Sequence, residues 1–231
     1  PGTGNGTALS ADADASDTLV NATVGNTIDY ADIDINDALT ASAIGSSTYA
    51  SANIDHSSVI YITDSDGTAD SVGMTITGTT DIETDKYLTI NLGVTDQAAE
   101  TAAGASLTFV FTGAVLGGGT LNVNGAQGVS GSAIAHVVDF ASTVTLAAAN
   151  FTGGAGADAG IGSALTLTDI AGASPITILT IAGGVGSTAD TNAGGLMTVT
   201  DIAGAMSGTT YNISGGAGSV SAYAGTAGAG G

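Results

Sequence analysis

The sequence predicts an all-β protein in two parts: a β-sandwich-like region over residues 1–105, then a region of repeated strand pairs over 106–231 that is solenoid-like or a layered sheet. Three observations predict this. Apolar residues alternate with polar ones in short runs, a unit of about 30 residues recurs in the second part, and most acidic residues fall in the first. With 43% hydrophobic residues and a mean hydropathy of +0.38, the composition is that of a folded chain, not a disordered one.

Apolar residues at every second position predict the individual strands. Residues 86–94 place their apolar side chains on one face with a period of two, and the same alternation predicts strands at 58–63, 72–77 and 107–112.

Two short helices are also expected in the first part. One covers residues 35–44, and the other covers 96–103, with Asp96 as its N-cap and Gly104 at its end.

The second part contains an internal repeat. Leu165–Ala173 recurs as Met197–Ala205, an offset of 32 residues, and an offset of 30 aligns Asn150–Gly156 with Thr180–Gly186. A fainter copy ends at Asn122–Gly128. Each unit consists of a strand, an Asp-apolar-Ala turn, a second strand and a Gly-Gly-x-Gly loop.

This repeat favours a stack of units. The alternative is a β-sandwich built from repeated hairpins, in which the sequence similarity between the units is accidental. A two-strand unit cannot bury its apolar face alone, so neighbouring units must cover it. In a stack, Asp139, Asp169 and Asp201 would align at about 4.8 Å, where like charges repel. Either a cation binds there, or the turns point into water as ordinary Asx turns.

The charge distribution excludes several classes of partner. Lys86 alone opposes 21 acidic residues, giving a net charge of −20, of which residues 1–100 carry −15 and 101–231 carry −5. Nucleic acids and anionic membrane surfaces are therefore excluded as electrostatic partners. The absence of Cys excludes disulfides and thiolate metal sites.

Membrane insertion is not expected, because no stretch approaches the ~18 uninterrupted apolar residues of a membrane helix. The chain begins at Pro1, not Met, which we interpret as a processed chain or a fragment, and both suit secretion.

The strongest candidate metal site is an acidic loop between two predicted strands. Asp64, Asp66 and Asp70, with Gly67 between them, follow the Asp-x-Asp-Gly opening of many calcium loops. Carboxylate oxygens are the ligands that Ca²⁺ prefers. The alternative is a polar hairpin turn.

A second acidic cluster surrounds Asp32 and Asp34, which share one side of an extended chain. Alone, such a cluster is more typical of a solvated face. Residues 1–100 carry a net charge of −15, and the repulsion between their carboxylates favours binding of divalent cations. We expect Ca²⁺ as the cofactor.

A third candidate is Gly153-Gly154-x-Gly156-x-Asp158, which resembles the nonapeptide of the RTX family. The resemblance implies a calcium-binding β-roll of the kind found in secreted bacterial proteins, with Asp158 as a ligand. The other Gly-Gly-x-Gly copies carry Thr188 and Val220 at the Asp position and lie about 30 residues apart, where the family repeats every nine.

Catalysis is not predicted. The two histidines are His56 and His136, and His136 lies three residues before Asp139, which places the two on opposite faces of a strand. No Gly-x-Ser-x-Gly nucleophile turn occurs. Both histidines are expected to be surface or core residues.

Small residues, strand repeats, acidity and the scarcity of Lys and Arg together resemble prokaryotic S-layer proteins and extracellular filament subunits. The resemblance implies a non-enzymatic cell-surface protein that polymerises with itself through β-strand edges and is stabilised by calcium. The alternative is an adhesin or carbohydrate-binding module of a secreted protein.

Two further features bear on partners. Glycans are possible at the Asn-x-Ser/Thr sequons of Asn5, Asn21, Asn150 and Asn212. The segment Asp17–Val24 is expected to dock into a neighbouring subunit as an added strand.

Overall fold

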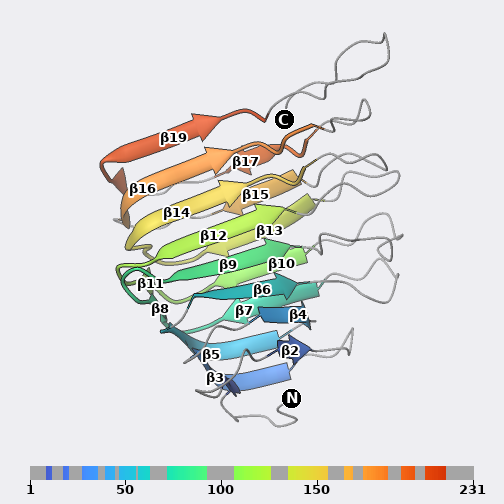
Figure 1. Ribbon diagram of the computed structural model, residues 1–231, viewed down its shortest axis with the longest axis vertical. Coiled ribbons are helices and arrows are strands. Elements are labelled where there is room, and N and C mark those ends of the chain that lie inside the picture. The colour runs from blue at the N-terminus through green and yellow to red at the C-terminus, as the bar shows by residue number, and fades with distance from the viewer. Residues whose placement is uncertain are drawn as a thin grey trace.

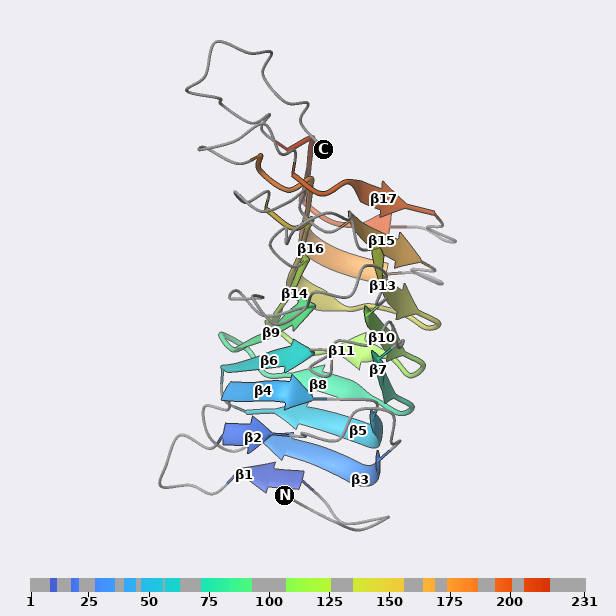
Figure 2. The same ribbon diagram turned by 90° about the vertical axis from the view of Figure 1, so that its right-hand side faces the viewer.

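The computed structural model describes residues 9–11, 18–20, 28–35, 40–44, 47–55, 57–62, 72–92, 107–125, 135–155, 164–168, 174–186, 194–200 and 206–216. Within these ranges the regular elements are β-strands, which form two long sheets along a common axis. Figures 1 and 2 show the strands stacked from β1 and β2 at one end to β17 and β19 at the other.

The two sheets have ten and nine described strands. Sheet A contains β1 (Leu9–Ala11), β3 (Ile28–Ile35), β5 (Ser47–Ile54), β7 (Val72–Ile76), β8 (Thr80–Ile82), β10 (Leu107–Phe111), β11 (Val115–Leu116), β13 (Ala135–Phe140), β15 (Ala164–Thr168) and β17 (Met197–Val199). Sheet B contains β2 (Thr18–Val20), β4 (Thr40–Ile44), β6 (Ser58–Ile62), β9 (Tyr87–Leu92), β12 (Thr120–Gly125), β14 (Leu146–Thr152), β16 (Ser174–Ala182), β18 (Met206–Ser207) and β19 (Thr210–Ser214).

All described strand pairs are parallel. Parallel neighbours cannot be joined by a tight hairpin, so the chain passes through one sheet and then the other before it returns. The result is a parallel β-solenoid, in which each coil adds one layer to both sheets. The solenoid expected for the repeat region is confirmed.

A short side separates the two long ones. The first half of β5 pairs with β7 and its second half pairs with β8, so the chain turns a corner between β7 and β8. Strand β11 lies beside β8, and Val144 forms a parallel bridge with Val115 of β11. Backbone hydrogen bonds hold the stacked corners together: the Thr77 N–H donates to the carbonyl of Tyr49 at 2.8 Å, and the Ala141 N–H donates to that of Phe111 at 3.0 Å.

The core fills the space between the sheets with rows of apolar side chains, a row being the residues in register on successive strands. Alternation along each strand sends every second side chain inward, and in β9 the inward residues Leu88, Ile90 and Leu92 are fully buried. One row of sheet B consists of Ile60, Ile90, Val123, Phe151 and Ile181.

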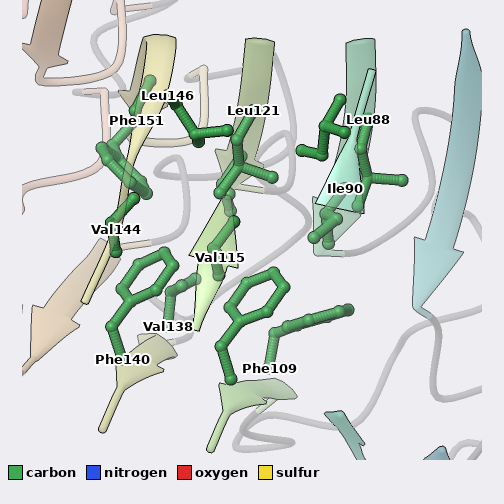
Figure 3. Close-up of a cluster of buried hydrophobic side chains, with 14 of the residues drawn as sticks. Leu88, Ile90, Phe109, Val115, Leu121, Val138, Phe140, Val144, Leu146 and Phe151 are labelled. Atoms are coloured by element: carbon green, nitrogen blue, oxygen red, sulfur yellow. The ribbon is translucent and has the colours of Figure 1, made fainter. Parts of the chain in front are cut away.

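The four phenylalanines of the sequence gather in the middle coils. Ring centroids are 4.6 Å apart for Phe109 and Phe111, 4.9 Å for Phe111 and Phe140, and 5.8 Å for Phe140 and Phe151. Figure 3 shows three of these rings among the surrounding aliphatic side chains. Aromatic contacts of this kind add to the stabilisation that burial alone provides.

The β-sandwich expected for residues 1–105 is not confirmed. The described strands of this region, from β1 to β9, pair in parallel and belong to the same two sheets as the later strands. The strands on either side of the acidic loop, β6 and β7, lie in different sheets, so they do not form the hairpin that was the alternative to a calcium loop.

The helix expected over residues 35–44 is wrong. Ile35 ends β3, and Thr40–Ile44 forms β4, which pairs with β2 on one side and β6 on the other. Pairing on both sides outweighs local helix propensity. The helix expected at 96–103 lies outside the described residues.

The repeat offsets are confirmed in sheet B and between β15 and β17 of sheet A, where Leu165 pairs with Met197 at the predicted offset of 32, and they differ between β13 and β15. In sheet B, Asn150 pairs with Thr180 and Leu179 with Tyr211, which are the predicted offsets of 30 and 32. In sheet A, the offset between β13 and β15 is 29, so Asp139 is in register with Thr168 and not with Asp169. The expected alignment of Asp139 with Asp169 is therefore wrong. The Thr168 hydroxyl donates to Asp139 Oδ1 at 2.6 Å, an arrangement that avoids the repulsion between carboxylates.

Candidate functional site

Most of the predicted calcium ligands lie outside the described residues: Asp64, Asp66, Asp70 and Asp158. Asp32 and Asp34 lie in β3, where they are in register with Ser51 and Asn53 of β5. In the described ranges, no three His, Cys, Asp or Glu residues come close enough together to hold a metal ion.

The Gly-Gly pairs of the repeat have a packing role. Gly153–Gly154, Gly183–Gly184 and Gly194–Gly195 are bonded through their backbones: the Gly184 N–H donates to the Gly195 carbonyl at 2.9 Å, and the Gly195 N–H donates to the Gly154 carbonyl at 2.8 Å. A Cβ atom added at Gly184 would lie 1.8 Å from the Gly154 carbonyl oxygen. Glycine is therefore required here by the close approach of neighbouring coils, whether or not a cation binds further along the motif.

His136 is a core residue. It faces inward from β13 in register with Leu165 of β15, and its side chain is fully buried. Desolvation lowers the pKa of His136 from 6.5 to about 4, so the ring is neutral at pH 7. Asp139 is partly exposed on the other face of the strand, as the spacing predicted. His56 lies outside the described residues.

A polar ladder that sequence reasoning missed covers the outer face of sheet B. The Asn150 amide donates to Asn122 Oδ1 at 2.9 Å, and the Asn124 amide donates to Asn91 Oδ1 at 2.9 Å. The Asn122 amide also donates to the Thr89 hydroxyl at 3.2 Å. These bonds connect three successive strands, β9, β12 and β14. The signal in the sequence was Asn-x-Asn at 122–124 with Asn at 91, in a region where the repeat is faint.

The sequons at Asn150 and Asn212 fall in one outer row, because both residues are in register with Thr180. Their environments differ. The Asn150 amide nitrogen is bonded to Asn122, whereas Asn212 is exposed on β19.

The most distinctive surface is the last coil, which we define as the described residues 194–200 and 206–216. It exposes four large apolar side chains: Leu196 (61%), Val199 (36%), Tyr211 (45%) and Ile213 (76%). Three of them continue buried rows of the core. Val199 follows Leu167, Tyr211 follows Leu179, and Ile213 follows Ile181, and none of these preceding residues is more than 4% exposed.

The strands of the last coil also have one free edge in the described structure. Strand β17 pairs only with β15, and β19 pairs only with β16. Unpaired N–H and C=O groups at such an edge are a template for another strand. Residues 197–200 and 206–216 carry no charged side chain that would oppose such pairing. The last coil therefore combines apolar side chains and backbone donors at one end of the solenoid.

No helix in the described part of the chain is long and apolar enough to cross a membrane. Comparison with family models, with curated proteins and with solved structures found no match, so the function has to be argued from the residues of this chain.

Proposed function

We propose that this protein is a non-enzymatic, extracellular structural protein that assembles with itself into a filament or surface layer through its β-strand edges. The observation that carries the proposal is the last coil, in which Val199, Tyr211 and Ile213 continue core rows but are exposed at a parallel edge that has no partner strand among the described residues. A soluble protein rarely leaves such a surface uncovered, since it lowers solubility and promotes association.

Charge opposes this association and suggests how it is controlled. Each copy carries −20, so copies repel one another over the Debye length, which falls from about 30 Å at 0.01 M salt to about 8 Å at 0.15 M. Bound Ca²⁺ would lower the repulsion directly. We propose Asp64, Asp66 and Asp70 as its main site, with Asp32 and Asp34 as ligands at a second site and Asp158 as a ligand at a third.

Sedimentation velocity and electron microscopy test the proposal. We expect monomers at low salt with a chelator, and ordered filaments or sheets when physiological salt and Ca²⁺ are added. Monomers under all of these conditions at high protein concentration would contradict it.

The calcium site is tested by the double substitution Asp64→Asn/Asp66→Asn. We expect the Ca²⁺ concentration at half-maximal assembly to rise by about tenfold or more, because two carboxylate ligands lose their charge. Glu83→Gln/Asp85→Asn is the matched control, since it also removes two negative charges and both residues are exposed and lie outside the acidic clusters. An equal effect of both variants would show that overall charge, and not a defined site, controls assembly.

The alternative function is that of an adhesin or carbohydrate-binding module, and the outer face of sheet B favours it. Here amide and hydroxyl groups lie in regular rows beside the exposed ring of Tyr87, and such groups can bond and stack on sugars. Binding of the monomer to a glycan array, lost on Tyr87→Ala substitution, would support this function. Absence of binding would leave assembly as the better proposal.

A further inference from the structure

We infer that copies of this chain associate head to tail, with the last coil of one copy stacked on the first coil of the next, which holds β1 and β2, so that β19 pairs in parallel with β2. This inference rests on the proposed self-assembly and specifies its geometry. The partner that covers the exposed rows of the last coil is a second copy of this chain.

The register of sheet B supports this arrangement. One row begins at Leu19 of β2, passes through the chain, and ends at Ile213 of β19. Its members are Leu19, Ala41, Ile60, Ile90, Val123, Phe151, Ile181 and Ile213. Leu19 and Ile213 are thus the first and last residues of one register row of sheet B, and stacking two copies makes that row continuous.

Sheet A does not show the same match. Its first described strand is β1, which is in register with Ile33–Ile35 of β3. The row that ends at Val199 of β17 reaches back to Ile28 of β3, opposite which β1 has no described residue. In a head-to-tail contact β17 would lie over β1, so the continuous row that supports the inference is the one in sheet B.

Strand direction distinguishes head-to-tail from tail-to-tail association. Strand β2 pairs only with β4, and β19 only with β16, so each has one free edge in the described structure. All described ladders are parallel, and only a head-to-tail contact continues them in the same direction. A tail-to-tail contact would join strands antiparallel and would break the rows.

Charge disfavours head-to-head association, which would bring together two regions with a net charge of −15 each. Head-to-tail association brings −15 against −5, and tail-to-tail association brings −5 against −5, so strand direction and not charge excludes the tail-to-tail contact. The strands that would pair, Thr18–Val20 and Thr210–Ser214, contain no charged residue. The two paired strands themselves therefore bring no carboxylates together.

This geometry also changes the interpretation of the N-terminal segment. The docking strand expected within Asp17–Val24 forms β2, which pairs with β4 of its own chain. Its contribution to a neighbour is therefore its free edge, and the segment does not need to leave its own sheet.

Engineered cysteines test the contact, because the chain contains no cysteine of its own. In parallel strands about 4.8 Å apart, residues in register have Cα atoms within the range of about 4.4–6.8 Å that a disulfide requires. We expect Leu19→Cys/Ile213→Cys to give, under mild oxidation, a ladder of covalent oligomers extending beyond the dimer. Each single variant should stay monomeric on a non-reducing gel. Leu19→Cys/Tyr87→Cys is the matched control, with an exposed residue on a middle coil, and should give no ladder.

Three outcomes would overturn the inference. A covalent dimer from Ile213→Cys alone would show tail-to-tail contact. Protection of that cysteine from a thiol reagent at concentrations where the protein is monomeric would show that residues 217–231 or another part of the same chain cover it. A ladder no stronger than that of the control would show no specific contact between these ends.

A second variant separates this inference from the proposed function. Ile213→Asp should raise the protein concentration needed for assembly by about tenfold or more while leaving the β-sheet circular dichroism unchanged, whereas Tyr87→Asp should have little effect. If wild-type protein assembles and Ile213→Asp assembles equally well, the end-to-end contact is wrong but self-assembly stands. If wild-type protein never assembles, both fail.

Discussion

The middle coils and the last coil have the same pattern of residues but differ in what covers them. Ile181 and Ile213 occupy equivalent positions in one row, yet Ile181 is 4% exposed and Ile213 is 76% exposed. The difference lies in the next layer, because β14 and β19 flank β16 whereas β19 has a described neighbour on one side only. In a solenoid, burial is therefore a property of the stack and not of the repeat unit.

The largest expected effect comes from removing an aromatic ring from a middle coil. Phe140→Ala should lower the free energy of unfolding by about 3–5 kcal/mol, because it leaves a cavity beside Phe111 and Phe151. Ile213→Ala, in the last coil, should change it by less than about 0.5 kcal/mol in the monomer. Denaturant unfolding under monomeric conditions measures both. Similar losses would mean that the last coil is covered within the monomer.

The next effect depends on pH and concerns His136, which has a fully buried side chain. Its pKa of about 4 lies below the 6.5 of an exposed histidine, so below pH 6.5 the unfolded state binds a proton that the folded state does not. Stability should therefore fall as the pH falls from about 6.5 toward 4, by about 2 kcal/mol at pH 5.

His136→Leu isolates this contribution, since Leu165 occupies the same row on the next strand. Relative to the wild type, the variant should gain stability progressively between pH 7 and pH 5, as followed by denaturant unfolding. A wild-type-minus-variant difference that does not change with pH would show that the histidine is protonated equally in both states.

The smallest effect comes from the polar ladder. Asn150→Ala should cost about 1 kcal/mol, because it removes the hydrogen bond to Asn122 Oδ1. Asn212→Ala, in the same outer row but exposed in the last coil, should cost a few tenths of a kcal/mol at most. A double-mutant cycle between Asn122 and Asn150 gives the coupling energy, and a value near zero would exclude a contribution of the ladder to coil stacking.

Much of the fold could be predicted from local patterns. Alternation identified β6, β7, β9 and β10 within a residue or two, and the Gly-Gly units revealed the stacking of sheet B. The parallel arrangement of the first hundred residues could not be predicted, because a period of two is shared by hairpins and solenoids. The wrong prediction that Asp139 aligns with Asp169 has a related cause. Small residues alone do not distinguish an offset of 29 from one of 30, yet a shift of one residue moves a side chain to the opposite face of the sheet.

The candidate site was less accessible to sequence reasoning. Residue types predicted cation loops at Asp64 and Asp66, which stay predictions, and Asp32 and Asp34 proved to lie in a strand. The exposure of Tyr211 and Ile213 had no local signal, because these residues are typical core residues by type and spacing. Only the position of the last coil in the stack reveals them.

Coil length in sheet B varies while the register does not. From β6 to β19 the successive offsets are 30, 33, 28, 30 and 32 residues, and each strand is still in register with the next. Differences in coil length are thus accommodated outside the paired strands of sheet B. A gene encoding such a chain can be lengthened by duplicating one unit of about 30 codons, each copy extending the rod by about 4.8 Å without redesigning its neighbours. The number of repeat units that the gene encodes therefore sets the length of the rod, while the cross-section of the rod stays the same.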